Sequence, residues 1–226
     1  MAVVQPTTTI FLGPQGCGKG TQITLLKEYL NIQDPSRAAA HFEMGKTLRE
    51  LGLKSDYTGR LTDEILKSGG LIPYAISASL FALYLMQHLP TNEEHILIDG
   101  FPRTATQVPM LDSALVEFYK RSLPTVVVIE ISDNEAVKRL LPRGRSDDTE
   151  ESIRKRLLWS REETIPNIEW FRNNQNYRVI NINGEQSIED THKEVLQKLA
   201  FQARSWIALL HEPLILIFIR TPFGDA

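Results

Sequence analysis

The chain has 226 residues, of which 42% are hydrophobic and 23% are charged, and its formal net charge at pH 7 is -3. This length suits one domain with a substantial core, and a charge this small, without long basic runs, gives no reason to expect nucleic-acid or membrane binding. The only cysteine, Cys17, excludes an intramolecular disulfide and a zinc site made of several thiolates. The first residues lack the positively charged segment of a secretory signal. We therefore expect a monomer in the reducing cytoplasm.

Short apolar runs alternate with segments of helical pattern along most of the chain. The predicted strands are residues 8–12, 38–42, 95–99, 125–131 and 177–182. The predicted helices include residues 19–30, 46–53, 58–67, 74–88, 148–172 and 188–203. Strands that alternate with helices indicate a parallel sheet with right-handed crossovers. The expected fold class is therefore three-layer α/β, with a five-stranded parallel sheet in a single domain over residues 1–226.

A glycine-rich segment follows the first predicted strand. Residues 13–19 satisfy the first seven positions of the pattern G-x-x-x-x-G-K-[ST], whose backbone N–H groups surround phosphate oxygens. Lys19 is placed to reach the outer phosphates, and the following helix adds a favourable dipole. The eighth position is Gly20, so direct Mg²⁺ binding by a hydroxyl there is not expected. The residues assigned to this ATP site are Gly13, Gly16, Cys17, Gly18, Lys19, Gly20 and Thr21.

Cys17 has two candidate roles within this loop. It is either a thiol switch on phosphate binding or a small residue that fits the turn.

Three motifs occur in the order seen in adenylate kinases and related nucleoside monophosphate kinases. They are GPQGCGKGTQ at 13–22, DGFPRT at 99–104 and GRSDD at 144–148, and the chain resembles this family from about Thr9 to Ala200. The resemblance implies a P-loop fold that transfers a phosphoryl group from ATP to AMP, with Mg²⁺ carried by ATP and no zinc. It also implies a helical insertion that binds the monophosphate at about 43–73 and a minimal lid at 142–148.

The resemblance also assigns the acceptor side of the site. Asp99 matches the family aspartate that holds Mg²⁺ through water, although a turn cap is the alternative role. Arg103 matches the arginine that binds the acceptor phosphate, and a guanidinium suits this role. Gln107 matches the glutamine that reads adenine, with an exposed helix glutamine as its alternative. The residues assigned to monophosphate binding are Met44, Gly45, Arg49, Leu71, Ile72, Gly100, Arg103 and Gln107.

The match is poorer before Arg49, the second arginine assigned to the acceptor phosphate. The family usually has S-T-G-D or S-A-G-E there, whereas this chain has Glu-Met-Gly-Lys at 43–46. Met44 replaces a small residue near the base, and Lys46 reverses a charge. Base specificity is therefore open at this segment.

The lid segment carries the remaining family assignments. The counterparts of Arg143, Arg145 and Arg154 surround the transferring phosphate and join Lys19 as catalytic residues, because fixed cations stabilise charge on its oxygens. The counterpart of Arg139 packs near the ATP base, and Asp147 and Asp148 belong to the lid. The structural alternatives are an N-cap at Asp148, with Glu151 three residues later, and an ion pair between Glu150 and Arg154.

The lid is so short that closure is expected to rely mainly on the insertion, while Arg143 and Arg145 still reach the phosphates. Other readings of function remain open: a UMP/CMP kinase or other nucleotide kinase, and a nucleotide-binding module that has lost transfer. Residues 201–226 lie beyond the resemblance. They form a docked helical extension, an apolar self-association patch or a disordered tail; their interrupted apolar runs argue against a membrane span.

Overall fold

The computed structural model describes residues 5–143 and 149–199. The expectations for Arg145, Asp147, Asp148 and residues 201–226 lie outside this range. The strands are β1 (Thr8–Leu12), β2 (Ala39–Glu43), β3 (His95–Asp99), β4 (Thr125–Glu130) and β5 (Arg178–Asn183). The α-helices are α1 (Lys19–Gln33), α2 (Met44–Gly52), α3 (Tyr57–Lys67), α4 (Tyr74–His88), α5 (Val108–Asp112), α6 (Asp133–Leu140), α7 (Glu150–Trp159), α8 (Ile165–Arg172) and α9 (Ile188–Lys198).

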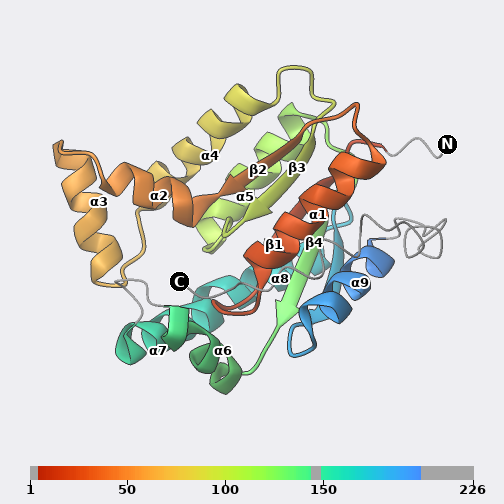
Figure 1. Ribbon diagram of the computed structural model, residues 1–226. Coiled ribbons are helices and arrows are strands. Elements are labelled where there is room, and N and C mark those ends of the chain that lie inside the picture. Colours follow the sequence, from red (N-terminus) through yellow and green to blue (C-terminus); the bar gives the residue numbers. More distant parts are fainter. Residues whose placement is uncertain (1–4, 144–148, 200–226) are drawn as a thin grey trace.

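The five strands form one parallel sheet in the order β2-β3-β1-β4-β5 (Figure 1). The expected fold class is therefore confirmed. The chain leaves β1 toward one edge through β2 and β3 and later crosses to β4 and β5 on the other side. The change of direction beside β1 is the point at which open parallel sheets bind ligands, outside the carboxyl ends of their strands.

Helices cover both faces of the sheet, because successive strand residues point to opposite sides. Ile10 and Leu12 of β1 pack into a core that is covered by α4, α5 and α8. Phe11 points the other way, into a core that is covered by α1 and α9. Strands buried on both faces are continuous apolar runs, which is why the sequence indicated them. Within the described residues, no helix is both long and apolar enough to span a bilayer.

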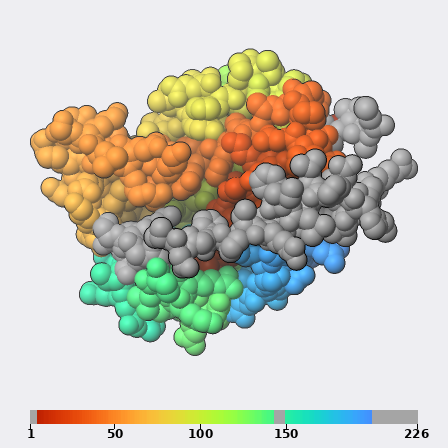
Figure 2. Space-filling view, viewed as in Figure 1, coloured from red at the N-terminus to blue at the C-terminus, as the bar shows by residue number. Residues whose placement is uncertain are grey.

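Two helix pairs extend from this framework. The insertion is formed by α2 and α3, which leave the carboxyl end of β2, and α6 with α7 follow the carboxyl end of β4 (Figure 1). In the space-filling view, the insertion in orange lies at the upper left and the α6–α7 pair in green lies below it (Figure 2). The amine Nζ of Lys155 on α7 donates a hydrogen bond to the carbonyl oxygen of Ser68, 3.1 Å away, just after α3. The end of the insertion helix α3 and helix α7 are therefore in contact here.

The helical stretch expected over 148–172 is confirmed from Glu150 to Arg172, with an irregular turn in its middle. The structure has α7, a π-helical turn at Ser160–Thr164 and then α8, which has Pro166 in its first turn. A proline is tolerated there because the first helical N–H groups have no partner within the helix. The N-cap of α7 is Thr149, whose hydroxyl accepts a hydrogen bond from the Ser152 amide at 3.2 Å.

Candidate functional site

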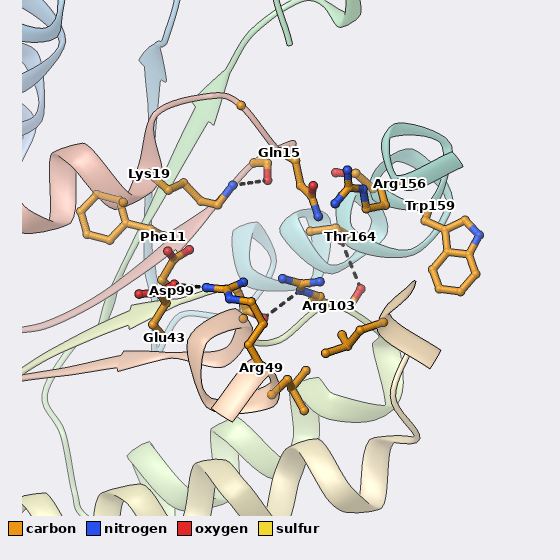
Figure 3. Close-up of a pocket in the computed structure, with 18 of the residues that line it drawn as sticks. Phe11, Gln15, Lys19, Glu43, Arg49, Asp99, Arg103, Arg156, Trp159 and Thr164 are labelled. Atoms are coloured by element: carbon orange, nitrogen blue, oxygen red, sulfur yellow. Dashed lines mark hydrogen bonds and ion pairs between the residues drawn. The ribbon is translucent and has the colours of Figure 1, made fainter. Parts of the chain in front are cut away.

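A cavity of about 920 Å³ lies at the carboxyl ends of β1, β2 and β3. Its volume is in the range of small-molecule sites. The phosphate loop forms one wall and the insertion another, while α7 and the π-helical turn close the far side (Figure 3). Segments far apart in the sequence thus meet around one space, as a site for two ligands requires.

The phosphate loop owes its path to its first glycine. Gly13 has a φ angle of +139°, and a Cβ atom there would lie 2.3 Å from the carbonyl oxygen of Ile129 on the neighbouring strand. The chain can turn this closely against β4 only without a side chain. Lys19 folds back over the loop, and its Nζ donates to the carbonyl oxygens of Gly13 and Pro14, each at 2.8 Å. The ammonium group is therefore held at the cavity, where phosphate oxygens would replace these carbonyls.

Two carboxylates lie opposite the loop. Asp99 ends β3 and Glu43 ends β2, and the two are paired in the parallel register, so their side chains share one face of the sheet. Both line the cavity and lie beside Lys19 in Figure 3. His41, two residues before Glu43, also lines it. Burial lowers the pKa of His41, while the charges of Asp99 and Glu43 oppose this shift.

Arginines line another part of the cavity. Arg103 is held by a hydrogen bond from its Nε to the carbonyl oxygen of Gly100, at 3.0 Å, and Arg49 reaches in from α2 (Figure 3). Burial lowers the pKa of Arg103; Asp99 opposes the shift, and the nearby charges of Arg156 and Arg49 add to it. These guanidinium groups repel one another, so the subsite attracts an anion.

Helix α7 contributes Arg156 and not Arg154. Arg154 donates from Nε and Nη2 to Glu150 at 3.0 and 2.8 Å on the exposed face, which confirms the expected ion pair. Arg156 lines the cavity and faces the side chain of Arg103. Residues two apart on a helix point in nearly opposite directions. Arg156 therefore lines the cavity, and Arg154, which was assigned to the transferring phosphate, is bound to Glu150 on the exposed face.

Most residues assigned from the sequence come together at this cavity. Those that line it are Gly13, Gly16, Gly18, Lys19, Gly20, Thr21, Gly45, Arg49, Leu71, Asp99, Gly100, Arg103 and Arg139. Arg139 is anchored by Glu135 Oε1 at 2.7 Å and by the carbonyl oxygen of Gly184 at 2.9 Å. The backbone of Arg143 ends the short 3₁₀ turn that follows α6.

Four assigned residues lie beneath the cavity surface. Met44 is in the core against the sheet, and Ile72 belongs to the same core. Cys17 is 2% exposed and packs under the phosphate loop. Gln107 is buried, so its reading as an exposed helix residue is wrong.

The amide of Gln107 is already engaged within the protein. Its Oε1 accepts hydrogen bonds from the backbone N–H groups of Arg103, at 2.6 Å, and Thr104, at 3.3 Å. Its Nε2 donates to Ser77 Oγ, 2.8 Å away on α4. Contact with adenine would therefore use its second amide hydrogen or an exchange of these bonds.

Sequence reasoning missed several lining residues, including Gln15, His41, Glu43, Arg156, Trp159, Ser160, Glu163 and Thr164. A signal for Arg156 was present. Ile153 and Leu157 are the buried residues of α7, and Arg156 shares their side of the helix. Ser160, Glu163 and Thr164 come from the π-helical turn, a feature that often occurs at functional sites.

A phosphate loop between a strand and a helix, beside an arginine-lined cavity at the switch point of a parallel sheet, defines a P-loop nucleotide-binding protein. Comparison with known sequences narrows the class. The sequence model of the family described as adenylate kinase matches residues 11–176. The chain belongs to the adenylate kinase family.

Relatives named adenylate kinase match most of the chain. The protein "Adenylate kinase" of Corynebacterium urealyticum is 35% identical over 187 residues, which is 83% of this chain and 96% of that protein. "Adenylate kinase 1" of Nostoc sp. is 36% identical over 84% of this chain and 96% of its own length. "Adenylate kinase" of Leptospira biflexa is 34% identical, with 84% and 98% covered.

Few side chains in the described part of the chain are placed to coordinate a metal ion. No group of three or more His, Cys, Asp or Glu side chains in residues 5–143 and 149–199 is arranged to hold a metal ion. Asp99 at the end of β3 and Glu43 at the end of β2 are the carboxylates beside Lys19 of the phosphate loop. That fits Mg²⁺, which keeps several waters and takes its other ligands from phosphates.

Proposed function

We propose that the chain catalyses reversible phosphoryl transfer, MgATP + AMP ⇌ MgADP + ADP. The observation that carries the proposal is the meeting of two anion subsites in one cavity: Lys19 with the phosphate loop on one side, and Arg49 with Arg103 on the other. Membership of the adenylate kinase family supports the reaction and the choice of AMP.

The two subsites divide the substrates between them. The phosphate loop and Lys19 bind the ATP phosphates, with Arg139 on the same side of the cavity, and Asp99 holds hydrated Mg²⁺. The ion, when bound, neutralises charge on the ATP phosphates. Arg49 and Arg103 hold the phosphate of AMP so that one of its oxygens faces the terminal phosphorus of ATP. No general base is needed, because the attacking oxygen is already anionic.

Arg156 completes the charge around the transferring group. Negative charge spreads over the equatorial oxygens in the transition state, and a fixed guanidinium between the subsites stabilises it. Arg143 and Arg145 are proposed to join it. The contact of Lys155 with Ser68 supports the expectation that the insertion, rather than a lid, closes the cavity.

The deciding experiment measures diphosphate formation from MgATP with AMP, CMP, UMP or GMP, with Lys19→Ala as control. Turnover with AMP that is lost in Lys19→Ala is the expected result. Turnover with CMP or UMP instead would make the chain a pyrimidine nucleotide kinase. ATP binding without turnover on any acceptor would leave only a nucleotide-binding module.

A second assay tests whether water is excluded. ATP hydrolysis measured without any acceptor is expected to be far slower than transfer to AMP, because water should not reach the terminal phosphate in a closed cavity. Equal rates of ATP consumption with and without AMP would show that the minimal lid leaves the phosphate open to water.

A further inference from the structure

The acceptor side of the cavity contains a carboxylate that the proposed reaction does not use. Glu43 is the last residue of β2, and the parallel register places it beside Asp99. Asp99 has a role beside the ATP phosphates, whereas Glu43 lies on the side of the insertion, next to Arg49 (Figure 3). A negative charge at a subsite for a phosphate dianion opposes binding.

Glu43 is bound to the arginine that the acceptor phosphate needs. Its Oε1 lies 3.1 Å from Nη2 of Arg49, and the side chains are 33% and 47% exposed. Gly45, between them in sequence, makes room for this contact: a Cβ atom there would lie 3.1 Å from Nη1 of Arg49. The guanidinium therefore folds back over the first turn of α2 toward the carboxylate.

Arg49 has a reason to keep an anionic partner. The charges of Arg156 and Arg49 both bear on Arg103, so cations are crowded on this wall. A carboxylate oxygen on Arg49 relieves part of this repulsion. A phosphate oxygen would make the same charge-assisted hydrogen bond, so the two anions compete for one guanidinium.

We propose that Glu43 is an internal competitor of the acceptor phosphate and sets the affinity for AMP. This inference rests on the proposed function, because it takes Arg49 to be a ligand of the AMP phosphate. The carboxylate holds Arg49 between turnovers and gives it up when AMP binds. Binding therefore carries the cost of breaking one ion pair and of placing the phosphate near a like charge.

The test measures the dissociation constant of AMP by calorimetry. Glu43→Gln keeps the size of the side chain and removes its charge. We expect this variant to bind AMP about 3- to 10-fold more tightly. This range combines the loss of a partly exposed ion pair with Arg49 and the loss of repulsion between Glu43 and the phosphate. Glu43→Ser is expected to act in the same direction. The matched control is Glu50→Gln, an exposed carboxylate on α2 whose partner is Lys46 at 3.9 Å; its AMP affinity should equal that of the unmodified chain.

A double-mutant cycle shows whether Glu43 acts through Arg49. In an Arg49→Ala background, we expect Glu43→Gln to give a clearly smaller gain in AMP affinity than in the unmodified chain, because only the like-charge repulsion is then left to remove. An undiminished gain in that background would overturn the proposal, since the effect would then be repulsion alone. Unchanged AMP binding by Glu43→Gln would also overturn the proposal. Weaker AMP binding would overturn it too, because it would mean that Glu43 positions Arg49 for the phosphate.

Failure of this inference is distinguishable from failure of the proposed function. Turnover of AMP by the unmodified chain tests the function, whereas the ratio of dissociation constants between Glu43→Gln and Glu50→Gln tests the competitor. MgATP affinity is measured in the same variants and is expected to change less than AMP affinity, because the carboxylate of Glu43 is bound to Arg49.

Discussion

Arg154 and Arg156 lie two positions apart on α7 and face opposite environments. Arg154 is bound to Glu150 in solvent, and Arg156 lines the cavity near Arg103. We expect Arg156→Ala to lower kcat about 10²- to 10³-fold, the usual effect of removing one fixed group that stabilises transition-state charge. Arg154→Ala should change kcat by less than about 2-fold, because an exposed i,i+4 pair contributes only ~0.3–0.5 kcal/mol. Steady-state kinetics of both variants decide the assignment; equal losses would contradict it.

The turn at Gly13 predicts a contrast in stability between two glycines. Gly13→Ala places a Cβ atom against the carbonyl oxygen of Ile129, in a residue whose φ is positive. We therefore expect the free energy of unfolding to fall by about 2 kcal/mol. Gly20→Ala meets no atom within 4 Å and lies in the first turn of α1. It should keep or raise stability, since alanine favours helix by up to ~1 kcal/mol. Urea unfolding measures both variants, and equal stability would show that the loop can move away from β4.

Gln107 is expected to contribute to the stability of the fold as well as to the binding of AMP. Gln107→Ala leaves the backbone N–H groups of Arg103 and Thr104 without their acceptor, at a cost of about 1–3 kcal/mol for buried groups. Gln107→Glu keeps the acceptor and should lose less. The free energy of unfolding is compared with AMP affinity in both variants. A normal stability in Gln107→Ala would mean that these N–H groups find other partners.

His192 on α9 predicts a dependence of stability on pH. Burial lowers its pKa from 6.5 to about 4, and its Nδ1 lies 3.1 Å from Gln22 Oε1, an arrangement that requires a proton on Nδ1 of the neutral ring. Because the folded pKa is depressed, the stability that depends on the neutral ring is complete above pH 6.5 and is lost as the pH falls toward 4. We expect a loss of about 1–2 kcal/mol at pH 5, discounted for partial exposure.

The control for this prediction is His192→Asn, which keeps a donor near Gln22 and removes the titration. Its free energy of unfolding should fall less between pH 7.5 and pH 5 than that of the unmodified chain. Burial also lowers the pKa values of His41 and His95. These residues remain in both proteins, so the difference between the two pH profiles isolates His192. Parallel profiles would contradict the buried neutral ring.

The sheet was predictable because its strands are short apolar runs between clear turns. Helix α4 was also predicted with its observed bounds, Tyr74–His88. The π-helical turn at Ser160–Thr164 was not, because one extra residue in a helical turn leaves no mark on a pattern that stays helical on both sides.

Within the site, motif residues were predictable and their orientations were not. The phosphate loop, Asp99 and Arg103 are fixed by local sequence, and the structure brings them to one cavity. To choose between Arg154 and Arg156, one must know which side of α7 packs against the core. The engagement of Gln107 depends on Ser77, which lies 30 positions away and is brought near only by packing of α4.

Cys17, the only thiol in the chain, is 2% exposed beneath the phosphate loop. Reagents in solvent therefore have little access to it in the folded protein. A cysteine introduced at Leu53, which is 86% exposed on the insertion, would be the one readily labelled position. A fluorescent probe attached there would test whether the insertion moves when nucleotides bind, without changing the native cysteine.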